Sequence, residues 1–311
     1  MWRDRILYGT LAVAGLIGVL ALDAFLSREA AGAGGVKGLV LHGMITTAIV
    51  ALLAVGGAVE ACALARAAGH DPARRVVVVA AFVLVLIPWL TRAMPQPPAG
   101  PEAWADWKWT GVAIAAAFML IGVAAMRAPE ISGSIARIGT SCMVILYVGF
   151  LGSFVVRLRQ AVSGPDGAWV LLYFLLVVKS ADIGAYAAGR LFGRRKVVPR
   201  ISPNKTLEGF IGGGVLAVLV ALAAALVLFG EGPLAEEGVR WTQGQSVVFG
   251  VVMAIAGPLG DLFESLLKRD AGVKDSGQRI PPFGGFLDLI DSPLFAAPVA
   301  WWLLTRGLLG G

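Results

Sequence analysis

Acidic and basic side chains alternate near the C-terminal end of this sequence, after a long apolar run. The acidic members are Asp261, Asp270, Asp275, Asp288 and Asp291, and the basic members are Lys268, Arg269, Lys274 and Arg279. Carboxylates separated by short glycine-rich turns suit a hard cation such as Mg²⁺, which takes oxygen ligands and keeps positions for substrate phosphates. The lysines and arginines would neutralise the remaining phosphate charge. This pattern indicates phosphate chemistry assisted by a divalent metal.

Ionisable residues also occur inside the apolar runs themselves. Lys179 and Asp182 lie one helical turn apart, while Asp261, Ser265 and Lys268 share one face of a helix. A charge at the centre of a membrane helix costs about 2.5 kcal/mol or more, so such residues are functional candidates by default. The alternative is that Lys179 and Asp182 only neutralise each other, and that other charges simply reach the membrane surface.

The segment 202–206, SPNKT, offers a second group of polar side chains. Ser202, Lys205 and Thr206 place two hydroxyls and an ammonium just before an expected helix start. Helix N-termini attract anions, so a phosphate could bind here. Thr206 or Ser202 could instead be an ordinary N-cap of that helix. The segment alone does not decide between these interpretations.

The elements that must position these residues are membrane helices. Of the 311 residues, 58% are hydrophobic and 15% are charged, and the mean hydropathy is +0.80, whereas soluble proteins carry about 25% charged residues. Because a bilayer core needs roughly 20 apolar residues per helix, we expect an all-α polytopic membrane protein with about nine transmembrane helices. The expected spans are 6–26, 43–65, 76–91, 110–126, 136–156, 167–189, 209–229, 245–267 and 292–310.

The distribution of basic residues predicts the orientation of these helices. Nine spans place the termini on opposite sides, and 17 of the 26 Lys and Arg residues then lie on the side of the N-terminus. Cytoplasmic segments carry the excess of Lys and Arg, which predicts a cytoplasmic N-terminus. The two richest segments, 190–208 and 268–291, would be cytoplasmic loops. We expect residues 1–160 to form N-terminal membrane helices and residues 161–311 to form the catalytic region.

The composition argues against several classes of protein. Basic tracts are short and polar low-complexity runs are absent, so neither nucleic-acid binding nor disorder is expected. With 2 Cys and 2 His, a disulfide scaffold or a Cys/His zinc site is not expected. The glycines at 212–214 indicate close helix packing and a possible homodimer contact.

The stretch 265–291 resembles the signature of the phosphatidate cytidylyltransferases, also called CDP-diacylglycerol synthases. The residues that match it are Ser265, Lys268, Arg269, Lys274, Asp275, Gly277, Pro281, Gly284, Gly285, Asp288 and Asp291. Two upstream segments, 182–193 and 201–209, are also similar to segments of that family. Three separate segments in the right order make the resemblance specific.

Two positions depart from the family signature. Phe283 stands where the signature has a histidine, and Leu289 stands where it has an arginine. These replacements remove one possible acid–base group and one fixed cation. The carboxylates and most of the basic residues remain, so we expect a divergent but active member.

The resemblance implies transfer of a cytidylyl group from CTP to phosphatidate, giving CDP-diacylglycerol and pyrophosphate. CTP, phosphatidate and membrane lipids would be the partners, and the site would face the cytoplasm from a bacterial inner membrane. Mg²⁺, with a possible second cation, would be bound by Asp261 and Asp288. The implied catalytic residues are Lys268, Arg269, Lys274, Asp275 and Asp291. The implied substrate-binding residues are Ser202, Lys205, Ser265 and Asp182.

Three other functions agree with parts of the pattern. A secondary transporter could use Asp182 and Asp261 as ion-coupling carboxylates, although no internal repeat is evident. A related enzyme could use CTP to activate another lipid phosphate or a polyprenol. A purely structural membrane protein would leave the ordered charged segments without a role.

Overall fold

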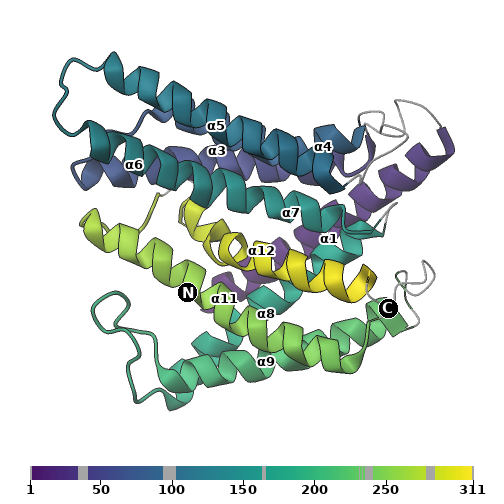
Figure 1. Cartoon of the computed structure of the whole chain (residues 1–311). Coiled ribbons are helices and arrows are strands. Elements are labelled where there is room, and N and C mark those ends of the chain that lie inside the picture. Colours follow the sequence, from purple (N-terminus) through teal and green to yellow (C-terminus); the bar gives the residue numbers. More distant parts are fainter. Residues whose placement is uncertain are drawn as a thin grey trace. The chain divides into compact units, whose positions relative to one another are not determined.

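The computed structural model describes residues 2–33, 41–93, 103–162, 166–230, 232, 234, 241–277 and 284–309. These residues are mainly helical (Figure 1). An isolated antiparallel bridge joins Lys196 and Thr206. The helices are α1 (Trp2–Ala33), α3 (Met44–Ala67), α4 (Arg74–Ala93), α5 (Ala103–Met126), α6 (Ser134–Val144), α7 (Leu151–Arg159), α8 (Gly167–Phe192), α9 (Leu207–Ala225), α11 (Gln243–Asp270) and α12 (Phe286–Leu309). Two π-helical turns, η1 (Ile145–Phe150) and η2 (Leu226–Gly230), continue α6 and α9.

Within the described ranges, eight helical segments are long and apolar enough to cross a membrane. Seven of them coincide within four residues with the expected spans from 43–65 to 245–267, and α4 continues through Pro88. The last begins at Phe286 and not at the expected residue 292, so Asp288 and Asp291 lie in α12 and not in a loop. Helix α1 covers the expected first span, 6–26. The prediction of an all-α polytopic membrane protein is therefore confirmed.

The chain forms two compact units. The first consists of residues 1–157 and 267–290, and the second of residues 158–266 and 291–311. The boundary after residue 157 lies close to the one expected at residue 160. The segment 267–290, however, groups with the N-terminal helices. The expected division into an N-terminal region and a catalytic region stays a prediction.

Small residues allow close helix packing in the first unit. Helix α3 contacts α1, α4, α6 and η1, and its Ala51, Ala54 and Ala58 are buried. In η1, a Cβ added to Gly149 would lie 2.7 Å from the Cα of Ala81 on α4. The missing side chains bring helix backbones into contact, as is common inside membranes.

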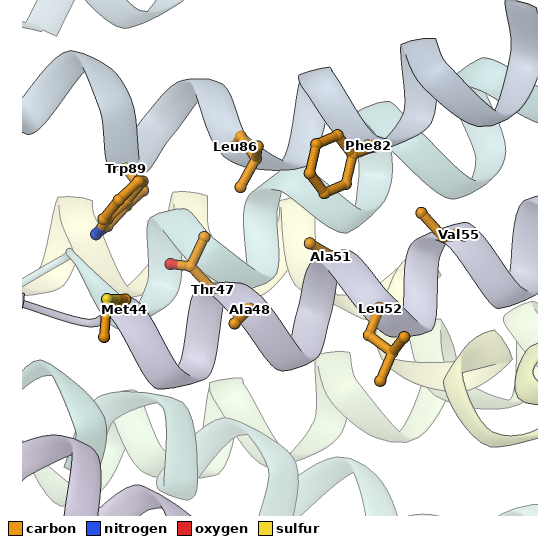
Figure 2. A pocket seen from close by; sticks show the side chains of 9 residues that line it. All are labelled: Met44, Thr47, Ala48, Ala51, Leu52, Val55, Phe82, Leu86 and Trp89. Carbon is orange, nitrogen blue, oxygen red and sulfur yellow. The ribbon is translucent and has the colours of Figure 1, made fainter.

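An apolar groove of about 400 Å³ lies between α3 and α4 in the same unit (Figure 2). It is lined by Met44, Thr47, Ala48, Ala51, Leu52, Val55, Phe82, Leu86 and Trp89. The Thr47 hydroxyl already donates to the Gly43 carbonyl, and the Trp89 indole donates to the His42 carbonyl. None of the lining residues carries a charge, so this groove does not provide a phosphate-binding site.

The second unit is built on the close pair α8 and α9 (Figure 1). A Cβ on Gly213 would lie 2.7 Å from the Ala181 carbonyl oxygen, and one on Gly184 would lie 2.8 Å from the Gly212 carbonyl oxygen. The close packing predicted for 212–214 is therefore confirmed at Gly212 and Gly213. The homodimer contact stays a prediction.

Aromatic residues complete the core of the second unit. The rings of Tyr173 and Phe249 stack with centroids 4.9 Å apart, and those of Phe229 and Trp241 stack at 5.9 Å. Such pairs add stability beyond the apolar area that they bury. They fix α8, η2 and α11 against one another, and two of these elements carry candidate site residues.

Candidate active site

The basic segment between α8 and α9 folds into a tight turn. Lys196 and Thr206 form the antiparallel bridge, and the Val197 amide donates to the Lys205 carbonyl at 3.1 Å. Thr206 is the N-cap of α9, where its hydroxyl accepts a hydrogen bond of 3.1 Å from the Gly209 amide. The capping role considered for Thr206 is thus confirmed.

Glu208 fastens this turn to the start of α9. Its carboxylate accepts hydrogen bonds from the backbone amides of Arg194, at 2.9 Å, and Arg195, at 3.2 Å. A carboxylate in the first turn of a helix is also favoured by the helix dipole. These bonds fix the turn that ends at Lys205.

Lys205 extends from this turn to α11. Its Nζ lies 2.9 Å from Asp261 Oδ2 and donates to the Pro258 carbonyl at 3.1 Å. The lysine side chain is 17% exposed, so its charge is largely removed from water and depends on these partners. Two residues that the sequence singled out in distant segments therefore meet in the second unit.

Asp261 also belongs to a cluster of three carboxylates. One oxygen each of Asp261, Glu264 and Asp291 lies within 4.8 Å of the others. Asp261 and Glu264 come from α11, and Asp291 comes from α12. A Cβ on Gly260 would overlap with the Asp291 carbonyl, so the glycine allows the two helices to approach closely. Ser265 adds a hydroxyl 3.4 Å from Asp261 Oδ1.

This cluster suits a divalent cation. Glu264 and Asp291 are 0% and 5% exposed, and gathering buried carboxylates is costly without compensating positive charge. Oxygen donors at such spacing are the ligands that Mg²⁺ prefers. Across the described ranges, this is the one group of three His, Cys, Asp or Glu residues close enough to hold a metal ion.

Lys179 and Asp182 on α8 lie beside the carboxylate cluster. Lys179 Nζ is 3.5 Å from Asp182 Oδ2, which confirms the predicted pair. Electrostatic interactions connect both residues with Asp291, and Asp182 also with Asp261 and Lys205. The second unit thus places two lysines beside four carboxylates.

The first unit contains a separate pair, Lys268 and Asp288. Lys268 Nζ lies 2.7 Å from Asp288 Oδ1. Asp288 Oδ2 accepts hydrogen bonds from the Ser276 hydroxyl at 2.7 Å and from the Gly285 amide at 2.8 Å. The last bond joins the third residue of α12 to the residue that precedes the helix, which is half of a capping box. Asp288 therefore binds both Lys268 and the start of its own helix, α12.

Four other predicted residues lie at exposed or half-buried positions. Arg269, Lys274 and Asp275 are exposed at the end of α11 and in the following turn. The side chains of Lys274 and Asp275 make no hydrogen bond or ion pair with another described residue. Ser202 is half-buried in the turn before α9, where its backbone makes hydrogen bonds. Their contacts with substrate stay predictions.

Of the two residues that depart from the family signature, the structure describes Leu289 but not Phe283. Phe283, like Pro281, lies outside the described residues. Leu289 is half-buried in the first turn of α12. The effect of the two replacements on substrate choice stays a prediction.

Sequence reasoning did not identify two residues that the structure singles out. Glu264 joins the carboxylate cluster, and Glu60 on α3 contacts the residues around Asp288. Glu60 interrupts the apolar run 43–65, so the rule that flags charges inside membrane spans would have found it.

Comparisons with known proteins match most of this chain to one family. The model of the cytidylyltransferase family matches residues 30–306. A phosphatidate cytidylyltransferase from Synechocystis sp. is 32% identical over 292 residues, covering 86% of this chain and 90% of that protein. Phosphatidate cytidylyltransferases from Mycobacterium leprae and Bacillus subtilis are 35% and 36% identical, over 58% and 54% of this chain.

The extent of these matches differs. The chain spans little more than half the length of the Mycobacterium leprae and Bacillus subtilis proteins, 54% and 58%. The family match instead runs through both compact units and includes every candidate site residue, and the Synechocystis match covers 86% of this chain. This chain belongs to the cytidylyltransferase family.

Proposed function

We propose that this protein transfers a cytidylyl group from CTP to phosphatidate and so produces CDP-diacylglycerol and pyrophosphate. The observation that carries the proposal is the contact of Lys205 with Asp261, next to Glu264 and Asp291. This constellation combines a fixed cation with a donor set for a divalent metal. Family membership and the names of the relatives support the same reaction.

The reaction brings together two anions and needs little covalent help from the protein. A phosphate oxygen of phosphatidate attacks the α-phosphorus of CTP, and a new P–O bond forms. The bond between the α-phosphorus and the bridging oxygen to the β-phosphate breaks, and pyrophosphate leaves with the electron pair. Catalysis of such a transfer rests on positioning and charge neutralisation.

Asp261, Glu264 and Asp291 are the residues that we assign to a Mg²⁺ ion. When bound, the ion would supply positive charge for the phosphate oxygens and for the leaving pyrophosphate. Lys205, held by Asp261 and the Pro258 carbonyl, would orient a phosphate at the same place. Lys179 and Asp182 would balance the charge of the cluster.

Asp288 has a different role in this proposal. Its Oδ1 accepts from Lys268 and its Oδ2 from Ser276 and Gly285, so protein groups already engage both carboxylate oxygens. In this proposal Asp288 holds Lys268 in place, and Lys268 would contact a substrate phosphate. The metal-binding role expected for Asp288 stays a prediction, as does a second cation.

The membrane setting decides how the substrates reach the site. The acyl chains of phosphatidate would stay in the bilayer, while CTP would arrive from the cytoplasm, the side on which we expect the segments 190–208 and 268–291. These are the two richest in Lys and Arg, as the positive-inside rule expects for cytoplasmic segments. With bacterial relatives, the inner membrane is the location that we propose.

The proposal is tested with purified protein in detergent, labelled CTP, phosphatidate and Mg²⁺. Formation of labelled CDP-diacylglycerol together with an equal amount of pyrophosphate is expected. A panel that adds a polyprenyl phosphate and other lipid phosphates tests whether Leu289 and Phe283 alter the substrate. Ion-driven uptake into vesicles without nucleotide turnover would instead favour a transporter.

A further inference from the structure

Glu60 is a buried carboxylate in the C-terminal half of membrane helix α3. It is 3% exposed, and the residues one turn before it are glycines. A Cβ on Gly56 would lie 2.5 Å from Cγ of Phe286, and one on Gly57 would lie 3.0 Å from Cδ1 of Ile290. The glycines therefore allow α3 to pack directly against the first turns of α12, with Glu60 at the end of this contact.

The Glu60 carboxylate binds the start of α12. Its Oε2 accepts a hydrogen bond of 3.0 Å from the Leu287 amide and lies 3.4 Å from the Ser276 hydroxyl. Leu287 is the second residue of α12, and the first four amides of a helix have no partner within the helix. Glu60 thus caps α12 from another helix.

Two signature glycines make room for Glu60. A Cβ on Gly277 would lie 2.5 Å from Glu60 Oε1, and one on Gly285 would overlap with Glu60 Oε2 and the Ser276 hydroxyl. Neither glycine has the positive φ that would by itself demand glycine. The physical reason for glycine at both positions is therefore the close approach of the Glu60 carboxylate.

The groups around Glu60 also hold Asp288. The Ser276 hydroxyl and the Gly285 amide both donate to Asp288 Oδ2, and Lys268 binds Oδ1. Ser276 contacts both carboxylates, and Leu287 is the backbone neighbour of Asp288. Glu60 is therefore linked to the Lys268–Asp288 pair through one intervening residue, either Ser276 or Leu287.

We propose that Glu60 is a positioning residue for the Lys268–Asp288 pair. It fixes Ser276 and the first turn of α12, and through them the direction in which Asp288 presents Lys268 to a substrate phosphate. A misplacement of about 1 Å in such a group can cost about 100-fold in rate. The catalytic part of this inference rests on the proposed cytidylyl transfer, whereas the capping of α12 does not.

The first test compares Glu60→Ala with Glu60→Gln. We expect Glu60→Ala to lower kcat by at least about tenfold with little change in KM for CTP, because the site is misaligned rather than removed. Glu60→Gln keeps an oxygen that can accept from the Leu287 amide, so its kcat should stay within about threefold of wild type. Thr47→Val is the control, because it also removes a buried polar group from α3. Wild-type kcat in folded Glu60→Ala would overturn the proposal.

The second test is a double-mutant cycle with Gly277→Ala. Alone, Gly277→Ala should lower kcat at least about tenfold, because the new methyl group collides with Glu60. In the Glu60→Ala background the same change should cost less than about threefold, since the colliding carboxylate is gone. Gly139→Ala, where a Cβ meets nothing within 4 Å, is the matched control. If the kcat losses of the two single variants simply multiplied in the double variant, the effect of Gly277→Ala would not arise from a collision with Glu60, and the proposal would be contradicted. Gly277→Ala also keeps the inference testable if Glu60→Ala does not fold.

A third measurement separates this inference from the proposed reaction. Hydrogen exchange of peptides covering 284–290 reports the Leu287 amide without any substrate. Faster exchange in Glu60→Ala, with wild-type exchange in Glu60→Gln, is expected. Wild-type protein that turned over no CTP, together with this exchange pattern in the two variants, would contradict the proposed cytidylyl transfer but support the capping of α12 by Glu60. Unchanged exchange in Glu60→Ala would overturn the capping itself.

Discussion

Lys268 on α11 and Asp288 on α12 form an ion pair of 2.7 Å in which the side chains are 12% and 15% exposed. Removing one partner of a buried pair leaves the other without compensation, which costs about 3–5 kcal/mol. Asp288 also holds Ser276 and the Gly285 amide through its second oxygen. A change at either residue therefore disturbs both the ion pair and the bonds that Asp288 makes to Ser276 and Gly285.

The first prediction concerns this pair. Lys268→Ala and Asp288→Asn should each lower cytidylyl transfer by at least about 100-fold, the loss typical of removing a positioned electrostatic group. The double variant should lose little more than either single variant, because the two residues act as a unit. The measurement is kcat/KM for CTP with phosphatidate in detergent.

The control for this prediction is Lys108→Ala, which removes an exposed lysine from α5 in the same unit. It should leave the rate within about twofold of wild type, as is usual for exposed charges. Wild-type turnover in both Lys268→Ala and Asp288→Asn would show that this pair is not part of the site.

The second prediction concerns Lys205. Lys205→Gln removes the charge that lies 2.9 Å from Asp261 Oδ2 but keeps a hydrogen-bond donor for the Pro258 carbonyl. We expect kcat/KM for CTP to fall at least about tenfold, because charge-assisted bonds to phosphate are about twice as strong as neutral ones. Lys196→Gln, in the same turn but with an exposed side chain, is the matched control. Equal losses in the two variants would assign the effect to the net charge of the loop.

The membrane helices could be predicted from the sequence because apolar runs of sufficient length have few alternatives in a bilayer. Even the short run 76–91, with Pro88 inside it, is helical, and α4 extends to Ala93. The grouping of 267–290 with the N-terminal helices could not be predicted in the same way. It depends on the contact of Gly56 and Gly57 with α12, and hydropathy contains no information about which helices meet.

The site was predictable where spacing along one helix decides the geometry. The Lys179–Asp182 pair follows from a separation of three residues, and it is present at 3.5 Å. Partners from different helices were not predictable. Glu264 and Asp261 on α11 lie close to Asp291, which comes from α12. The contacts of Glu60 could not be predicted, because its partner residues lie more than 200 positions away in the sequence.

The third prediction concerns the metal. Removal of divalent cations with a chelator should abolish turnover, and added Mg²⁺ should restore it. Asp291→Asn should raise the Mg²⁺ concentration needed for half-maximal rate by at least about tenfold, since even residues that only orient metal ligands have effects of 10–100-fold. Asp270→Asn, an exposed carboxylate at the end of α11, is the control. Identical Mg²⁺ titrations for Asp291→Asn and wild type would remove Asp291 from the metal site.

The last prediction separates backbone strain from contact with Asp288. Gly284 has φ 97°, and a Cβ there would lie 2.8 Å from Asp288 Oδ2. Gly69 has a similar φ of 86°, but a Cβ there meets nothing within 4 Å. Alanine at either position should cost about 1–2 kcal/mol of backbone strain, seen as a lower unfolding temperature. Only Gly284→Ala should also lower kcat, by at least about tenfold, because the methyl group displaces the carboxylate that holds Lys268. Equal kcat in the two folded variants would mean that the exact position of Asp288 does not limit the reaction.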